Sequence, residues 1–177
     1  MAYSESEHLD DILYGQWVVD QFYELVPKHY EIIKASTYDD ITKHYDIIIK
    51  NIKNDVSFLI EIKGAKRKFK YIDGVLQPRV DDVWIELIGI SGHPGWLYGD
   101  AKYIAFYRTD GRFCFVDRLK LIEHVTRMHF LYVRKNGYGM ATKENINYYQ
   151  RYSRSGNLDI CVYIPSDIIE DLHENIF

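Results

Sequence analysis

The chain of 177 residues predicts a single α/β (α+β) domain in which helices flank a mixed, largely antiparallel central sheet. Three observations predict this class. A helical pattern fills the N-terminal part, several short segments rich in β-branched residues follow it, and helix and strand patterns alternate towards the C-terminus. The sequence contains no repeat at a fixed period and no low-complexity stretch. We therefore treat residues 1–177 as one domain, with a core at about 6–130 and a C-terminal strand–helix extension at about 131–177.

The first predicted element is a helix from Ser6 to about Ala35, in which apolar residues recur at helical spacing. Pro27 breaks or restarts this helix, because its ring clashes with the preceding turn. Residues 36–44 are rich in turn-forming residues and predict a loop. Residues 45–52 and 57–64 are short and β-branched, and Asn-Asp turn chemistry separates them, so they predict a hairpin.

The second half of the chain predicts a further run of strands and then helices. Asp110–Gly111 favours a type I′ hairpin turn between two of these strands. Residues 132–157 are polar and aromatic, and predict an excursion in which one further strand is possible. Ser166 is the candidate N-cap of the last helix. The predicted elements are strands at 81–90, 101–108, 112–117 and 157–165, and helices at 118–129 and 167–177.

Composition excludes several classes of protein. The formal net charge is −4, so nucleic-acid binding would need a local basic patch. Cys114 and Cys161 have apolar neighbours and predict buried free thiols, and the lack of a C-x-x-C pair excludes a structural zinc site. The N-terminus is acidic, unlike a signal peptide, and no apolar run reaches the length of a membrane span. We therefore expect a soluble protein in a reducing, cytoplasmic compartment. No phosphate-binding glycine motif and no G-x-S-x-G element occurs.

The predicted hairpin carries a group of charged residues at one end. Asp46 begins its first strand, and Glu61 and Lys63 lie near the end of its second strand, so the hairpin brings all three together. Alternation puts Glu61 and Lys63 on one face and Ile60 and Ile62 on the other. Two carboxylates and the Ile62 carbonyl form a hard-oxygen set that suits Mg²⁺ or Mn²⁺. A lysine beside them suits metal-assisted hydrolysis of a phosphodiester.

An Asp, a hairpin and then Glu-x-Lys resemble the signature of the PD-(D/E)XK nuclease superfamily, which includes restriction endonucleases, Holliday-junction resolvases and phage nucleases. The resemblance covers about Ser6 to Asp117. It implies a central sheet of about four strands flanked by helices, and Mg²⁺- or Mn²⁺-dependent cleavage of DNA. It also implies that Asp46 and Glu61 hold the metal with the Ile62 carbonyl, and that Lys63 is catalytic.

The sequence also departs from the family pattern. Tyr45 stands where the named proline would precede the aspartate, and no Gln-x-x-x-Tyr element follows the lysine. The family often adds a glutamate from the leading helix, for which Glu24 is preferred over Glu7 and Glu31. The segment around Glu86 is similar to a phage-type branch with a Glu on the strand after the lysine. Glu86 is therefore either a further metal or supporting carboxylate, or a surface residue on an alternating strand.

Basic and aromatic residues near this motif are the candidates for contact with DNA. A cluster of basic residues beside the motif could hold phosphates, although solvated loop charge is the default interpretation of any one of them. Trp96 lies in a Gly-rich loop and could stack on an unpaired base, or it could fill the core. The candidate nucleic-acid-binding residues are Lys66, Arg67, Lys68, Lys70, Arg79 and Trp96.

We therefore expect a DNA endonuclease that acts on duplex or branched DNA, of resolvase type and encoded by a phage, in a bacterial cytoplasm. Dimerisation is an expectation from the family. Two alternatives remain: a catalytically silent nuclease fold that binds DNA, and a phage protein that binds a host protein.

Overall fold

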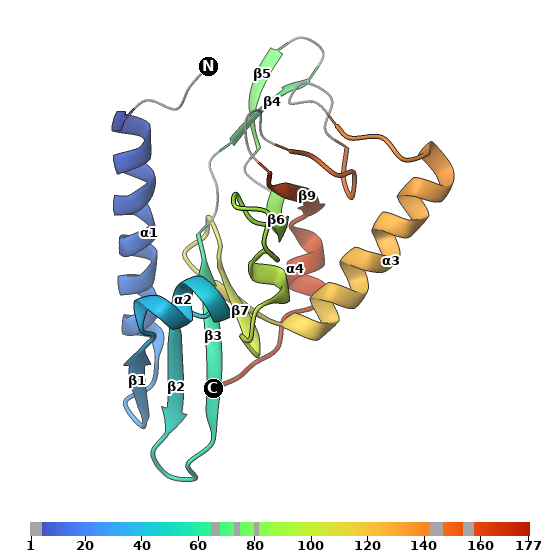
Figure 1. Cartoon of the computed structure of the whole chain (residues 1–177). Helices are drawn as coiled ribbons and strands as arrows, with labels where there is room; N and C mark the ends of the chain where they lie inside the picture. Colours follow the sequence, from blue (N-terminus) through green and yellow to red (C-terminus); the bar gives the residue numbers. More distant parts are fainter. Residues whose placement is uncertain (1–4, 65–67, 73–74, 80–81, 142–146, 154–157) are drawn as a thin grey trace.

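The protein is mixed α/β, with a five-stranded mixed sheet flanked by helices (Figure 1). The structure, a computed structural model, describes residues 5–64, 68–72, 75–79, 82–141, 147–153 and 158–177. The strand order is β1-β2-β3-β7-β8, in which β3 and β7 are parallel and the other neighbours antiparallel. These strands are β1 (Tyr30–Lys34), β2 (Ile47–Asn51), β3 (Ser57–Lys63), β7 (Tyr103–Tyr107) and β8 (Phe113–Asp117).

Two strand pairs and the helices complete the described structure. The β4–β5 and β6–β9 pairs are both antiparallel, and β4, β5 and β6 lie in the long crossover between the parallel strands β3 and β7. The strands are β4 (Lys68–Ile72), β5 (Val75–Arg79), β6 (Asp82–Ile88) and β9 (Ile160–Pro165). The helices are α1 (Glu5–Leu25), α2 (Thr37–Lys43), the 3₁₀ turn η1 (Trp96–Tyr98), α3 (Arg118–Asn136) and α4 (Asp167–Asp171).

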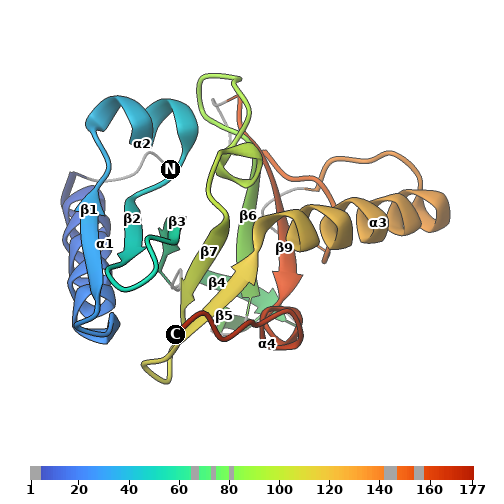
Figure 2. The same ribbon diagram turned by 90° about the horizontal axis from the view of Figure 1, so that it is seen from below.

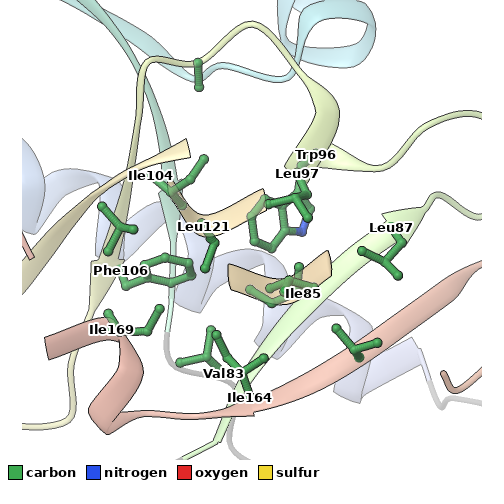
Figure 3. Packing of buried hydrophobic residues seen from close by; sticks show 14 of the residues in the cluster. Val83, Ile85, Leu87, Trp96, Leu97, Ile104, Phe106, Leu121, Ile164 and Ile169 are labelled. Carbon is green, nitrogen blue, oxygen red and sulfur yellow. The ribbon is translucent and has the colours of Figure 1, made fainter. Parts of the chain in front are cut away.

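The central sheet is buried on both faces. On one face, Ile60 and Ile62 of β3 pack with Val18 and Phe22 of α1. On the other face, a second core contains side chains of β7, β8, β6, β9, η1 and α3, among them Trp96 and Phe106 (Figure 3). Figure 2 shows α1 on one side of the sheet and α3 on the other. Because alternate residues of β3 point to opposite cores, Glu61 and Lys63 must point towards the second core.

The predicted hairpin at 45–64 and the strands at 81–90, 101–108, 112–117 and 157–165 are confirmed. The helix prediction to Ala35 is wrong beyond Leu25. Val26 still donates to the Phe22 carbonyl, but the chain then turns at Pro27 and Tyr30–Lys34 pairs with β2 as an edge strand. The charged Glu31 and Lys34 suit that edge.

The loop prediction at 36–44 is also wrong, because α2 forms there. The Ser36 side chain accepts a hydrogen bond from Asp39 N at 3.1 Å, and Ser36 Oγ donates to Asp39 Oδ2 at 2.8 Å. Ser36 is therefore a side-chain N-cap, which stabilises the first turn of a short helix. His44, with φ of 51°, ends α2.

Two predicted helix boundaries also change, and one strand pair and one turn differ from the prediction. The helix predicted at 118–129 extends to Asn136, so the first residues of the predicted excursion are helical. The C-terminal helix covers only Asp167–Asp171, and Ser166 is its N-cap residue without a side-chain cap bond. The β4–β5 pair was not predicted. The turn at Asp110–Gly111 is not type I′, since a positive φ is found at Gly111 but not at Asp110.

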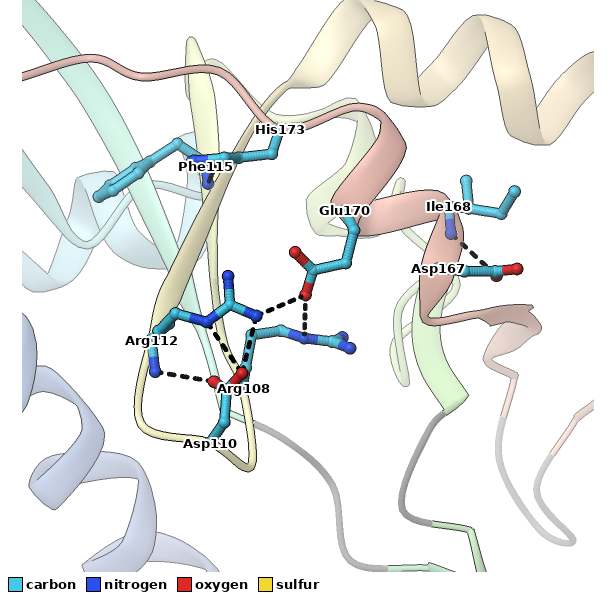
Figure 4. Close-up of polar contacts among 8 residues, drawn as sticks. All are labelled: Arg108, Asp110, Arg112, Phe115, Asp167, Ile168, Glu170 and His173. Carbon is cyan, nitrogen blue, oxygen red and sulfur yellow. Dashed lines mark hydrogen bonds and ion pairs between the residues drawn. The ribbon is translucent and has the colours of Figure 1, made fainter.

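Charged side chains join α4 to the β7–β8 hairpin (Figure 4). Glu170 Oε1 lies 3.3 Å from Arg108 Nε and 3.4 Å from Arg112 Nη2, and Arg112 also pairs with Asp110 at 2.7 Å. His173 Nδ1 accepts a hydrogen bond from Phe115 N at 3.0 Å. The C-terminal segment is therefore attached to the central sheet. No helix within the described ranges is long and apolar enough to cross a membrane.

Candidate active site

The structure brings Asp46, Glu61 and Lys63 together where β2 begins and β3 ends. Asp46 N donates to the Ile60 carbonyl at 2.9 Å, and Asp46 Oδ2 accepts a hydrogen bond from Ile62 N at 2.5 Å. The second contact replaces a backbone ladder bond with a side-chain bond. It therefore fixes the Asp46 carboxylate against the strand that carries the other two residues.

The backbone of Ile62 faces the Asp46 carboxylate. In a β-strand, the N–H and C=O of one residue point to the same side of the strand. Because Ile62 N donates to Asp46, the Ile62 carbonyl is also directed to the β2 side, where the β2–β3 ladder has already ended at the Ile47–Ile60 pair. The predicted set of two carboxylates and one carbonyl is thus gathered at the same strand end.

Glu61 is buried and incompletely paired. It is 3% exposed, and Oε1 forms an ion pair with Lys63 Nζ. Its second oxygen, Oε2, is buried and has no hydrogen-bond partner among the described residues. A buried carboxylate oxygen without a partner is unfavourable, and such atoms in folded proteins call for a specific explanation.

Burial and mutual charge set the pKa values of the group. Burial and the charge of Glu61 raise the pKa of Asp46 to about 7, although Lys63 and the Ile62 N–H act in the opposite direction. Burial also raises the pKa of Glu61, against the effect of Lys63. Burial lowers the pKa of Lys63, but the charges of Glu61 and Asp46 outweigh it and raise that pKa above its ordinary value. The group holds a proton more readily than isolated carboxylates do.

Trp96 lies against Lys63 and closes the site from the core side. Lys63 Nζ is 5.2 Å from the centre of the indole ring, within range of a cation–π contact. Trp96 is 3% exposed, so the prediction that it stacks on an unpaired base is wrong. Its Nε1 is buried and, among the residues that the structure describes, has no hydrogen-bond partner. The ring acts as one wall of the site.

Two further acids influence the group. Glu86 is half-buried on β6, and its negative charge raises the pKa values of both Glu61 and Lys63. Asp40, an exposed residue of α2, raises the pKa of Asp46 and Glu61. Sequence reasoning missed Asp40 because it took the segment to be a loop; the S-x-x-D capping pattern was the available signal.

The segment after η1 positions the chain before Asp46. Asp100 N donates to the Lys43 carbonyl at 2.6 Å. A Cβ atom on Gly99 would lie 2.5 Å from the Lys43 carbonyl oxygen and 2.5 Å from His44 Cβ, so only glycine allows this approach. On its other side, the Asp46 carbonyl accepts from Ala35 N at 2.9 Å. Asp46 is therefore fixed from two directions.

Glu24 does not join the site, contrary to the prediction from the leading helix. It is exposed on α1, which covers the face of the sheet opposite to Glu61 and Lys63. It instead lines a surface cavity of about 510 Å³ with Arg112 and Phe177. A sheet thus separates Glu24 from the other acids.

The predicted basic cluster is only partly described. Lys66 and Arg67 lie outside the described residues. Lys68, Lys70 and Arg79 belong to the β4–β5 pair, in which Lys68 is opposite Arg79. The backbone thus places these bases on one hairpin that follows Lys63 in the chain.

In the described part of the chain, no group of three or more His, Cys, Asp or Glu side chains is arranged to hold a metal ion. Glu86 therefore does not complete a three-carboxylate group with Asp46 and Glu61.

Comparison with protein-family models, curated proteins and solved structures returned no match. The site must therefore be judged on its own geometry.

Proposed function

We propose that the protein is a divalent-cation-dependent DNA endonuclease of the PD-(D/E)XK type, with Asp46, Glu61 and Lys63 as its catalytic residues. The observation that carries the proposal is the buried Glu61 carboxylate beside the fixed Asp46 carboxylate. One Glu61 oxygen pairs with Lys63, and the other has no partner in the part of the chain that the structure describes. A purely structural ion pair would gain from a partner on each oxygen.

The donor set fits Mg²⁺ or Mn²⁺. Asp46, Glu61 and the Ile62 carbonyl supply hard oxygen ligands, and such cations accept few protein ligands because they retain several waters. The pKa of about 7 for Asp46 means that a bound cation would replace a proton that this site readily takes up. The unpaired Glu61 oxygen offers one ligand position without breaking a contact.

Each residue then has a distinct task. A bound cation would supply Lewis-acid stabilisation of the phosphate and acidify a water for attack. Lys63 remains protonated because Glu61 and Asp46 raise its pKa, so it stabilises negative charge on the phosphate and orients the water, and does not act as a base. Trp96 holds the ammonium group in place.

The arrangement of elements supports the family assignment. A leading helix, a strand that begins after an aspartate and a neighbouring strand that ends in Glu-x-Lys occur in the order expected for a restriction-endonuclease-like core. Within this proposal the substrate is duplex or branched DNA, as for a resolvase. A phage origin, a homodimer and a bacterial cytoplasm remain parts of the same proposal.

The test is cleavage of plasmid, branched and single-stranded DNA with Mg²⁺ or Mn²⁺. We expect Asp46→Asn, Glu61→Gln and Lys63→Met each to lower the cleavage rate by at least about a hundredfold, since each removes electrostatic stabilisation of the transition state. Lys102→Met is the matched control, because Lys102 also pairs with a buried strand-end carboxylate, Asp117. Cleavage that survives in folded Asp46→Asn and Lys63→Met proteins would exclude this site.

A catalytically silent DNA-binding protein is the second candidate. It is favoured by the lack of a three-acid group among the described side chains. Calorimetric titration with Mn²⁺ separates the two candidates: a nuclease binds the ion in an Asp46-dependent way, whereas a silent site does not. DNA binding without Mn²⁺ binding would support the silent form.

A further inference from the structure

The charge of the protein is unevenly distributed along the chain. Residues 124–157 contain six Lys or Arg and one Asp or Glu, a net charge of +5, whereas the whole chain carries −4, so the remainder carries −9. This segment comprises most of α3 and the chain that leads to β9. Such a local excess of positive charge on an acidic protein points to a polyanionic ligand.

The second half of α3 projects beyond the sheets. Figures 1 and 2, which are related by a rotation of 90°, both show the C-terminal end of α3 extending away from the rest of the fold. An inner stripe at helical spacing attaches the helix to the core, through Leu121, Val125, Met128 and Tyr132. The opposite face of the helix is left to solvent.

The solvent face of α3 carries basic side chains that form no ion pair with the described residues. Arg127, Arg134 and Lys135 are exposed, and within the described residues their side chains have no hydrogen-bond or ion-pair partner. The two bases at the start of the helix are different, because Arg118 donates to the Ala101 carbonyl at 2.6 Å and Lys120 pairs with Glu174 at 2.6 Å. The free positive charge is therefore concentrated in the projecting half.

Exposed aromatic rings lie among these bases. Phe130 is 61% exposed and follows Arg127 by three positions, so both side chains lie on one face. Tyr138 is 90% exposed. It follows Gly137, whose φ of 82° ends α3. The rings and the bases thus share the solvent side of the helix.

We propose that this surface, formed by Arg127, Phe130, Arg134, Lys135 and Tyr138 and here called the α3 surface, binds a single-stranded segment of DNA. The DNA phosphates would contact the Arg and Lys side chains, and unpaired nucleobases would stack on the two aromatic rings. The inference rests on the proposed nuclease function only for the choice of DNA as the nucleic acid. It adds that the substrate contains an unpaired strand next to the cleaved duplex.

A duplex and a membrane fit this surface less well. Bases paired in a duplex are stacked on one another and cannot use exposed rings. A helix that lies on a membrane needs a wide apolar face, whereas the apolar stripe of α3 packs against the protein core. Basic side chains interleaved with single aromatic rings are typical of proteins that bind single-stranded nucleic acid.

The test is fluorescence anisotropy with a labelled single-stranded oligonucleotide and its matched duplex, with the full chain in EDTA. For the triple variant Arg127→Glu, Arg134→Glu, Lys135→Glu we expect at least about tenfold weaker single-strand binding and a salt slope smaller by about 2. For Phe130→Ala with Tyr138→Ala we expect about fivefold or greater loss for the single strand and under about twofold for the duplex.

The matched control is Lys28→Glu, Lys34→Glu, Lys53→Glu, which changes the net charge equally at exposed positions far from α3 in sequence. Equal losses in the control and in the triple variant, or an equal effect of the ring variants on both DNAs, would overturn the proposal. α3-dependent binding to phosphatidylserine vesicles without single-strand binding would also overturn it. Because EDTA prevents cleavage, this result is independent of nuclease activity, and an inactive protein can still show α3-dependent binding.

Discussion

Glu61 and Asp117 are both buried carboxylates at the end of a strand, and each forms an ion pair with a lysine. Both carboxylate oxygens of Asp117 have partners. Oδ2 pairs with Lys102, and Oδ1 caps α3 by accepting hydrogen bonds from Leu119 N at 2.8 Å and Lys120 N at 3.2 Å. Glu61 pairs with Lys63, but its other oxygen has no partner within the described ranges of the chain. A buried carboxylate paired with a lysine thus occurs once with both oxygens hydrogen-bonded and once, among the described residues, with one oxygen left without a partner.

The two environments shift the carboxylate pKa values in opposite directions. Burial alone raises the pKa of Asp117, but the hydrogen bonds from Lys102 and the two backbone N–H groups outweigh it and lower that pKa below its ordinary value. At the other pair, burial prevails and the pKa of Glu61 is raised. Satisfied hydrogen bonds explain a structural role for Asp117, whereas the unsatisfied Glu61 is the better candidate for binding a ligand.

Replacing each lysine separately gives the largest expected difference in stability between the two pairs. Lys63→Met leaves the Glu61 carboxylate buried without its cation, so we expect the free energy of unfolding to fall by about 3 kcal/mol near neutral pH. Lys102→Met should cost about 1 kcal/mol or less, because the Lys102 side chain is 47% exposed and Asp117 keeps its two backbone donors. Urea denaturation measures both, and equal losses would remove the distinction between the two pairs.

The pH dependence of stability sharpens the comparison. Because the folded-state pKa of Asp46 is raised to about 7, the stability that its proton contributes is present below about pH 4 and is lost as the pH rises to about 7. Asp46→Asn keeps an acceptor for Ile62 N but removes the charge. We therefore expect the free energy of unfolding of the variant to increase by about 2 kcal/mol, relative to that of the natural protein, as the pH rises from about 4 to about 8.

Denaturation curves across that pH range measure the gain, and added Mn²⁺ supplies a control. The ion should stabilise the natural protein and leave Asp46→Asn unchanged, because only the former can exchange a proton for the cation. Parallel pH profiles for the two proteins would contradict the raised pKa.

The smallest expected effect concerns the satisfied carboxylate. Asp117→Ala removes the cap of α3 and should cost about 1 kcal/mol near neutral pH. Because the folded-state pKa of Asp117 is lowered, its contribution is present above about pH 4 and is lost as the pH falls below that value. We expect DNA cleavage by the folded variant to equal that of the natural protein. Loss of cleavage without unfolding would show that the two pairs are not separate in function.

Local spacing was enough to identify the three central residues. The hairpin register that pairs Ile47 with Ile60 places Asp46 beside Glu61, and the period of two places Lys63 on the same face as Glu61. The β1 segment was not recognised because "YEIIK" is compatible with both helix and strand, and pairing with β2 decides between them. The helix α2 depends on its cap at Ser36, which outweighs the turn-forming composition.

The positions of Trp96 and Glu24 depend on which elements meet in space. A Gly-rich loop does not reveal whether its tryptophan faces solvent or Lys63, and helical spacing does not reveal which face of the sheet α1 covers. The sequence alone determined the β2–β3 hairpin, the strands β6, β7, β8 and β9 and the acid–lysine motif, because these follow from neighbours along the chain. The tertiary structure alone decided the burial of Glu61, its unpaired oxygen and the exposure of the α3 surface, because desolvation depends on residues that are distant in sequence.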